Sequence, residues 1–335
     1  MVSVVKMKSF VPAASLAWLL MLGFRADALT TSAISSRRAP VSSFSPGRRL
    51  QASSWSSSSS SSSRRRRAVS VAPRASLAAV FPGFLPAALT TQAGAGFGIN
   101  TALGLAGAFT GAYSKMLTPS GLLHAWALGV ILWSSFGWRG WSLCVVYLLA
   151  GSRVTKVKMA DKVALGIGEG RGGKRGPENV WGSAATGALC ALAALRWPQH
   201  AALMNLGYVA SIATKLSDTF ASEIGKAYGY NCFLITSLKP VPRGTEGAVS
   251  VEGTLAGVGG SLIIAAYGAL VGLIGRDCRS LALVAAAAFV GTTAESYIGA
   301  IAQDKVKLLT NEVVNFLNTL IGGAFAIGVA VSGVW

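Results

Sequence analysis

A series of long apolar segments, separated by shorter polar ones, occupies the chain from about residue 95 to residue 333. Several of these segments approach the roughly 20 apolar residues that a helix needs to cross a bilayer. They lack the strict alternation of a membrane-barrel strand, so helices are the expected spanning structure. The sequence therefore predicts an all-α, polytopic membrane helix bundle with about seven or eight transmembrane helices. The approximate segments are 95–113, 120–137, 140–152, 181–197, 203–225, 253–275, 281–302 and 311–333.

Charge is scarce and unevenly distributed. Only 13% of the 335 residues are charged, against about a quarter in soluble domains. The formal net charge is +18, yet 12 of the 30 Lys and Arg residues lie in residues 1–77 beside a single acid, Asp27. The rest of the chain contains no basic helix with interleaved aromatic residues, so the composition argues against nucleic-acid binding.

Residues 1–77 have the composition of a targeting leader. An apolar run from Val11 to Phe24 follows two lysines and resembles a signal-peptide core. Residues 31–77 are rich in Ser and Arg and poor in acids, as in a plastid or mitochondrial transit peptide. We interpret the pair as a bipartite plastid leader, with a single unusual transit peptide as the alternative. The predicted domains are therefore a leader over 1–77 and an integral membrane domain over 78–335.

Counting spans places three polar connections on one side of the membrane. Two apolar segments separate 153–180 from 226–252, and two more separate the latter from 303–310. Together with Lys115, these connections hold 13 Lys and Arg residues, whereas the opposite side holds Arg139, Arg196, Arg276 and Arg279. The positive-inside rule then predicts that the polar connections face the cytoplasm-equivalent side, which is the stroma for a plastid inner envelope.

The first of these connections, residues 153–180, contains six glycines and several bases. Glycine lets a backbone approach an anion closely. The spacing Gly168-x4-Gly173-Lys174 nearly matches a P-loop, but Arg175 replaces the required Ser or Thr. A loop that binds lipid headgroups is the simpler alternative, although such a loop gains little from the nearby Glu169 and Glu178. A magnesium–phosphate site uses both bases and acids.

The segment 203–225 places polar residues on one helical face. The spacing i, i+4, i+7, i+11 and i+14 holds for Ser211, Lys215, Asp218, Ser222 and Gly225. Charged residues at membrane depth are costly and point to function. Hydrogen bonding between helices, combined with close packing at Gly225, remains the structural alternative.

Three later stretches continue the pattern. The connection 226–252 carries Lys239, Arg243 and Thr245, which could surround an anion or simply form a solvated connector. Two later spans carry further polar strips on single faces, which the count of spans places on the same side of the membrane. These strips are Thr292, Glu295, Ser296 and Gly299, and then Asn311, Asn315 and Asn318.

Five strings among these stretches resemble the plastid phytyl-phosphate kinase family of the vitamin E pathway, over roughly residues 95–330. The family implies transfer of a nucleotide γ-phosphoryl group, from CTP or another NTP, to phytyl monophosphate. The product, phytyl diphosphate, serves tocopherol and phylloquinone synthesis and phytol salvage. The family also implies an isoprenoid monophosphate substrate, contact with membrane lipids and a plastid location. The chemistry of the phosphates requires Mg²⁺ as a cofactor. The strings are 155–162, 171–187, 213–229, 238–247 and 310–319.

The chemistry of this reaction suggests roles for the polar residues. Catalysis is expected from Asp218, Lys174, Arg175 and Arg243. Phosphate binding is expected from Lys156, Lys162, Arg171, Lys215, Ser222, Lys239 and Thr245. Mg²⁺ is expected at Asp218 with Glu223, Glu178 or Glu295. A CTP-dependent cytidylyltransferase acting on a lipid phosphate and a membrane transporter remain the alternatives.

Overall fold

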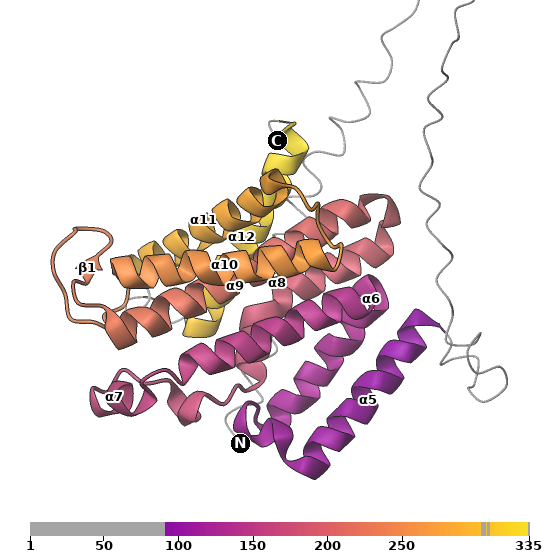
Figure 1. Ribbon diagram of the computed structural model, residues 1–335, viewed down its shortest axis with the longest axis horizontal. Helices are drawn as coiled ribbons and strands as arrows, with labels where there is room; N and C mark the ends of the chain where they lie inside the picture. The colour runs from indigo at the N-terminus through magenta and orange to yellow at the C-terminus, as the bar shows by residue number, and fades with distance from the viewer. Residues whose placement is uncertain (1–90, 303–305, 307–308, 334–335) are drawn as a thin grey trace, which may run out of the picture. The chain divides into compact units, whose positions relative to one another are not determined.

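The computed structural model describes residues 91–302, 306 and 309–333 (Figure 1). The predicted leader, and the expected start of the membrane domain at residue 78, lie outside these residues. The described part is largely α-helical, with one short antiparallel pair of strands, β1 (Phe233–Leu234) and β2 (Ala248–Val249). Its α-helices are α5 (Gln92–Thr110), α6 (Pro119–Thr155), α7 (Met159–Ala164), α8 (Pro177–Arg196), α9 (Ala201–Tyr228), α10 (Val251–Leu270), α11 (Cys278–Ala302) and α12 (Asn311–Ser332).

The predicted fold class, an all-α membrane bundle, is confirmed. Four of the helices in the described residues are long and apolar enough to cross a membrane. They are α6, α10, α12 and the Cys278–Ile301 part of α11. Each of the predicted apolar segments coincides with a helix or with half of α6.

Helix α6 has two arms joined at a kink. It covers 37 residues, but Gly137 interrupts it with φ 67° and ψ −162°, a backbone conformation open essentially to glycine alone. The side-chain amide of Gln92 donates to the carbonyls of Trp133 and Ser134 at 3.0 and 2.9 Å, which satisfies groups that a helix end leaves unpaired. The two apolar segments expected at 120–137 and 140–152 therefore form the two arms of one bent helix.

Helix α9 forms the centre of the bundle and contacts α6, α8, α10, α11 and α12. Small residues on α9 and on the helices that pack against it allow these helices to approach closely. On α12, for example, Gly322 faces Thr214 so tightly that a Cβ there would lie 2.0 Å from the threonine hydroxyl oxygen. This close contact buries the middle of α9 completely, including its Lys215 and Asp218.

The polar connections 156–176 and 229–250 meet at one end of the bundle, as the count of spans predicted. The first, expected as a flexible loop, contains the short helix α7 and a tight turn at Gly170–Gly173. It is fixed to the preceding connection by Arg175, whose backbone N–H donates to Met116 and whose carbonyl accepts from Thr118, at 2.9 and 3.0 Å. The connection is thus an ordered wall of the bundle end.

Candidate functional site

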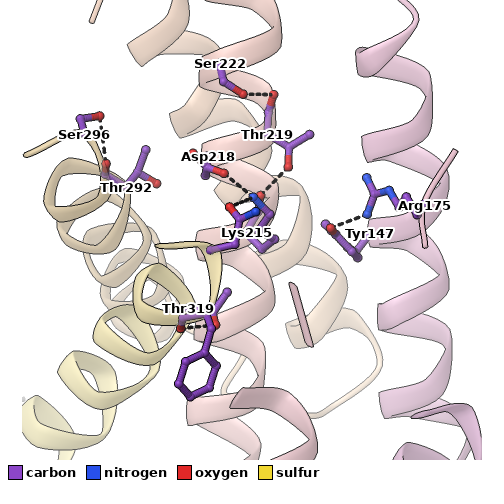
Figure 2. A network of polar contacts seen from close by, with 11 residues as sticks. Tyr147, Arg175, Lys215, Asp218, Thr219, Ser222, Thr292, Ser296 and Thr319 are labelled. Carbon is purple, nitrogen blue, oxygen red and sulfur yellow. Dashed lines mark hydrogen bonds and ion pairs between the residues drawn. The ribbon is translucent and has the colours of Figure 1, made fainter. Parts of the chain in front are cut away.

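A polar cavity of about 470 Å³ opens at this end of the bundle. Its walls come from the end of α6, the turn at Gly170–Gly173, the start of α8, the second half of α9, the connection around β2, and the facing parts of α10, α11 and α12. Segments far apart in the sequence therefore contribute to one site. Figure 2 shows part of its polar network, with α9 in the middle.

Lys215 and Asp218 form an ion pair one turn apart on α9 (Figure 2). Lys215 also donates from Nζ to Oδ1 of Asn315 on α12, at 2.7 Å. The residue exposures are only 7% for Lys215 and 6% for Asp218. Charges this deeply buried are tolerated because each has a partner, and removing one partner would strand the other. The helical spacing in the sequence predicted this polar face correctly.

Glu295, on α11, brings a second carboxyl group into the same cavity, where it interacts electrostatically with Asp218. Two ionised carboxyl groups in one cavity repel each other, and the single Lys215 ammonium balances only one of the two negative charges. The neighbouring hydroxyl of Thr292 also lines the cavity and has no hydrogen-bond partner within the described residues. The site thus offers oxygen ligands that a hard cation could use.

These oxygen atoms could supply part of the coordination shell of a magnesium ion. The described residues contain no group of three or more His, Cys, Asp or Glu side chains arranged to hold a metal alone. Mg²⁺ is commonly held by one or two carboxylates, with waters and phosphate oxygens completing its coordination. The Asp218–Glu295 pair meets that requirement, while a self-sufficient protein cage is absent from the described residues.

Arg175 faces the cavity from the side opposite α9 (Figure 2). Its guanidinium donates from Nη1 to the hydroxyl of Tyr147, and the guanidinium carbon lies 4.8 Å from the centre of the Tyr147 ring. Gly151, on the same helix as Tyr147, leaves room for the guanidinium, since a Cβ there would lie 2.6 Å from Nη2 of Arg175. Tyr147 escaped the sequence analysis because a tyrosine within an apolar span carries no distinguishing signal.

Arg171 pairs with Glu178 at the exposed rim, and it also donates to Oδ1 of Asn179 at 2.8 Å. Burial acts to raise the pKa of Glu178, but hydrogen bonds from its own backbone and from Arg171 outweigh it and lower that pKa below its usual value. Glu178 therefore stays ionised and engaged with Arg171. Of these three residues, Arg171 and Asn179 line the cavity.

Lys162 forms an ion pair with Glu223 inside the protein, with exposures of 1% and 2% respectively. Its ammonium also donates to the carbonyl of Thr155 at 2.7 Å. The pair joins α7 to α9 and so connects the polar connection to the central helix. Glu223 reaches the cavity wall, whereas Lys162 lies behind it.

The structure brings together nine of the predicted site residues at the cavity wall. Arg243, Lys156 and Lys239 are exposed and lie outside the described lining, and the Arg243 guanidinium donates to the carbonyl of Ala227 at 3.4 Å. The predicted roles of all these residues stay predictions. The nine lining residues are Arg171, Lys174, Arg175, Lys215, Asp218, Ser222, Glu223, Thr245 and Glu295.

The fold and the site together define a polytopic membrane protein that gathers buried charges at one end of its helix bundle. The chain belongs to the DUF92 family of integral membrane proteins, whose model matches residues 102–323. No solved structure was found to match it.

Three relatives illustrate the range of the family. An uncharacterized membrane protein of Synechocystis sp. is 57% identical over 216 residues, 64% of this chain and 83% of the relative. Protein VTE6, chloroplastic, of Arabidopsis thaliana is 44% identical over 63% of this chain and 64% of its own length. An uncharacterized membrane protein of Methanocaldococcus jannaschii is 32% identical over 64% of this chain and 86% of the relative. These matches confirm the resemblance to the plastid phytyl-phosphate kinase family and its polytopic membrane relatives.

Proposed function

We propose that this chain is a lipid-phosphate kinase, which transfers the γ-phosphoryl group of CTP or another NTP to phytyl monophosphate and yields phytyl diphosphate. The observation that carries the proposal is the cavity, where Arg171, Lys174 and Arg175 face the carboxyl groups of Asp218 and Glu295. The similarity to a chloroplastic relative supports a plastid location.

The reaction suits a site without a strong general base. The acceptor phosphate is largely ionised near neutral pH, because its second pKa is about 6. One of its oxygens attacks the γ-phosphorus, the bond from that phosphorus to the β-bridging oxygen breaks, and a nucleoside diphosphate leaves. The main obstacle is the repulsion between two polyanions, so cations and positioning supply most of the catalysis. Arg175 and Lys174 would bind phosphate oxygens from the connection side, and Lys215 from α9.

Asp218 and Glu295 are the best-placed residues to hold Mg²⁺ with the nucleotide phosphates. A bound Mg²⁺ would neutralise phosphate charge as it does in other phosphoryl transfers. Glu223 and Glu178, the other expected ligands, each engage a base, Lys162 and Arg171 respectively. Asp218 also engages a base, Lys215, but the carboxyl group of Glu295 interacts with it inside the cavity. We therefore assign the metal to the Asp218–Glu295 pair, and Glu223 and Glu178 to holding the cavity wall.

The direct test is transfer of labelled phosphate by the full chain in membranes supplied with Mg²⁺. We expect label from γ-labelled CTP or ATP to appear in phytyl diphosphate, and membranes without the chain to give none. Release of pyrophosphate, with α-label from CTP entering the lipid, would replace the kinase proposal with a cytidylyltransferase. If folded protein yields neither product, both the kinase proposal and the cytidylyltransferase alternative would be wrong.

We further propose that the protein lies in the plastid inner envelope with its cavity facing the stroma, because the connections at that end are rich in bases. Cys278 is exposed and begins α11, at the opposite end of α10 from the cavity. In intact envelope vesicles with the stromal face inside, we expect a membrane-impermeant maleimide to label Cys278 immediately. A Lys239→Cys variant carrying Cys278→Ser should react only after permeabilisation. The reverse pattern would invert the proposed orientation.

A further inference from the structure

A shallow apolar groove runs along the outer side of α6, next to the cavity. Its one charged lining residue is Arg153, and Phe220 contributes a wall from α9. The α6 positions in its lining recur at intervals of three and four residues, so they form one face of that helix. The full lining is Val146, Leu149, Ala150, Arg153, Val154, Val157 and Phe220.

The groove and the polar cavity occupy neighbouring stripes of the same two helices. Tyr147 and Thr155 line the cavity, and each directly follows a groove residue, Val146 and Val154 respectively. Successive residues of a helix point about 100° apart, so the two linings lie on neighbouring faces of α6. A molecule with a polar head and an apolar tail could therefore occupy both.

The groove runs in the direction that a lipid tail takes when the lipid head lies at the membrane surface. From Val146 to Val154 the helix rises about 12 Å, and it advances toward the end of the bundle where the cavity opens. Arg153 is exposed at that end, where long basic side chains favour the membrane–water boundary and phosphate groups. The apolar part of the groove lies deeper, beside the span.

We propose that this groove binds the isoprenoid tail of the lipid monophosphate whose head enters the cavity, with Arg153 at the junction of tail and phosphate. The proposal rests on the proposed function for its substrate, and it adds where the tail lies. A groove that is open along its side lets a long chain enter from the bilayer without first passing through water.

The first test fills the groove with Ala150→Phe and compares acceptors of different length. We expect the KM for phytyl monophosphate to rise about tenfold, with little change in kcat. The reason is that the phenylalanine ring fills the groove, so the tail of the substrate loses apolar contact area there. The KM for the five-carbon dimethylallyl monophosphate should stay the same. The matched control is Ala286→Phe, at an exposed position of α11. An equal change for both acceptors, or an unchanged KM for the long one, would overturn the proposal.

A second test does not depend on phosphoryl transfer. A twenty-carbon isoprenoid monophosphate with a diazirine on its last unit, photolysed with the full chain in membranes, should attach to residues 146–157 or Phe220. Unlabelled phytyl monophosphate should prevent this attachment, and phosphatidic acid should not. Attachment elsewhere, or equal competition by phosphatidic acid, would show an ordinary lipid-facing surface. Attachment in the groove without any kinase activity would instead overturn the proposed function alone.

Discussion

Replacing Asp218 with Asn is expected to reduce phosphoryl transfer at least about 100-fold while leaving the bundle folded. Asn has nearly the same volume and its side-chain oxygen can still accept from Lys215. The Lys215 ammonium keeps its bond to Asn315 and the nearby charge of Glu295, so it is not stranded and the bundle stays folded. The negative charge next to Glu295 is lost, and with it the pair of carboxylates proposed to hold Mg²⁺. Transfer of labelled γ-phosphate to phytyl monophosphate measures the effect.

The matched control is Asp161→Asn, which makes the same chemical change at an exposed position of α7. That variant should retain wild-type transfer. Glu295→Gln should resemble Asp218→Asn, because each removes one carboxylate from the same pair. Near-wild-type turnover by a folded Asp218→Asn protein would disprove the metal assignment. A Mg²⁺ requirement unchanged in both variants would do the same.

Replacing Lys162 with Met is expected to lower the free energy of unfolding by about 3–5 kcal/mol. The reason is that the Glu223 carboxylate, at 2% exposure, would remain buried without its cation. Reversible unfolding of the full chain in mild detergent, followed by circular dichroism, measures the change. The exposed Arg171–Glu178 pair provides the comparison, since Arg171→Ala should cost at most about 1 kcal/mol.

A double variant separates a structural role for Lys162 from the phosphate-binding role predicted from the sequence. Changing Lys162→Met and Glu223→Leu together removes both charges, and should recover most of the lost stability. If Lys162 only positions the connection against α9, transfer should recover as well. Restored stability with transfer still abolished would mean that one of the two charges takes part in the reaction.

The helix spans and the polar face of α9 were predictable because both depend on local periodicity. Lys215, Asp218 and Ser222 share a face by spacing alone, and the structure places all three at the cavity wall. Likewise, the count of spans predicted that the connections would meet at one end. These inferences need only the rise and turn of a helix and the hydrophobicity of each segment.

The pairing of charges could not be predicted, because it depends on contacts between distant segments. Lys162 and Glu223 are 61 positions apart, and Lys215 and Asn315 are 100 positions apart. The sequence offered several bases and several acids without indicating which would meet. It also left open that Glu178 would be taken by Arg171, while Glu295 would face Asp218. The predictions for the leader over residues 1–77 lie outside the described residues.

The contact between Lys215 and Asn315 also bears on how the protein is made. Asn315 belongs to α12, which leaves the ribosome after the other helices that the structure describes, whereas Lys215 is part of α9. Until synthesis reaches α12, the ammonium lacks this partner, and the wall of the cavity formed by the start of α12 is missing. The charged centre is therefore completed only when α12 has been inserted, so a chain terminated before α12 would insert α5 to α11 without acquiring a finished site.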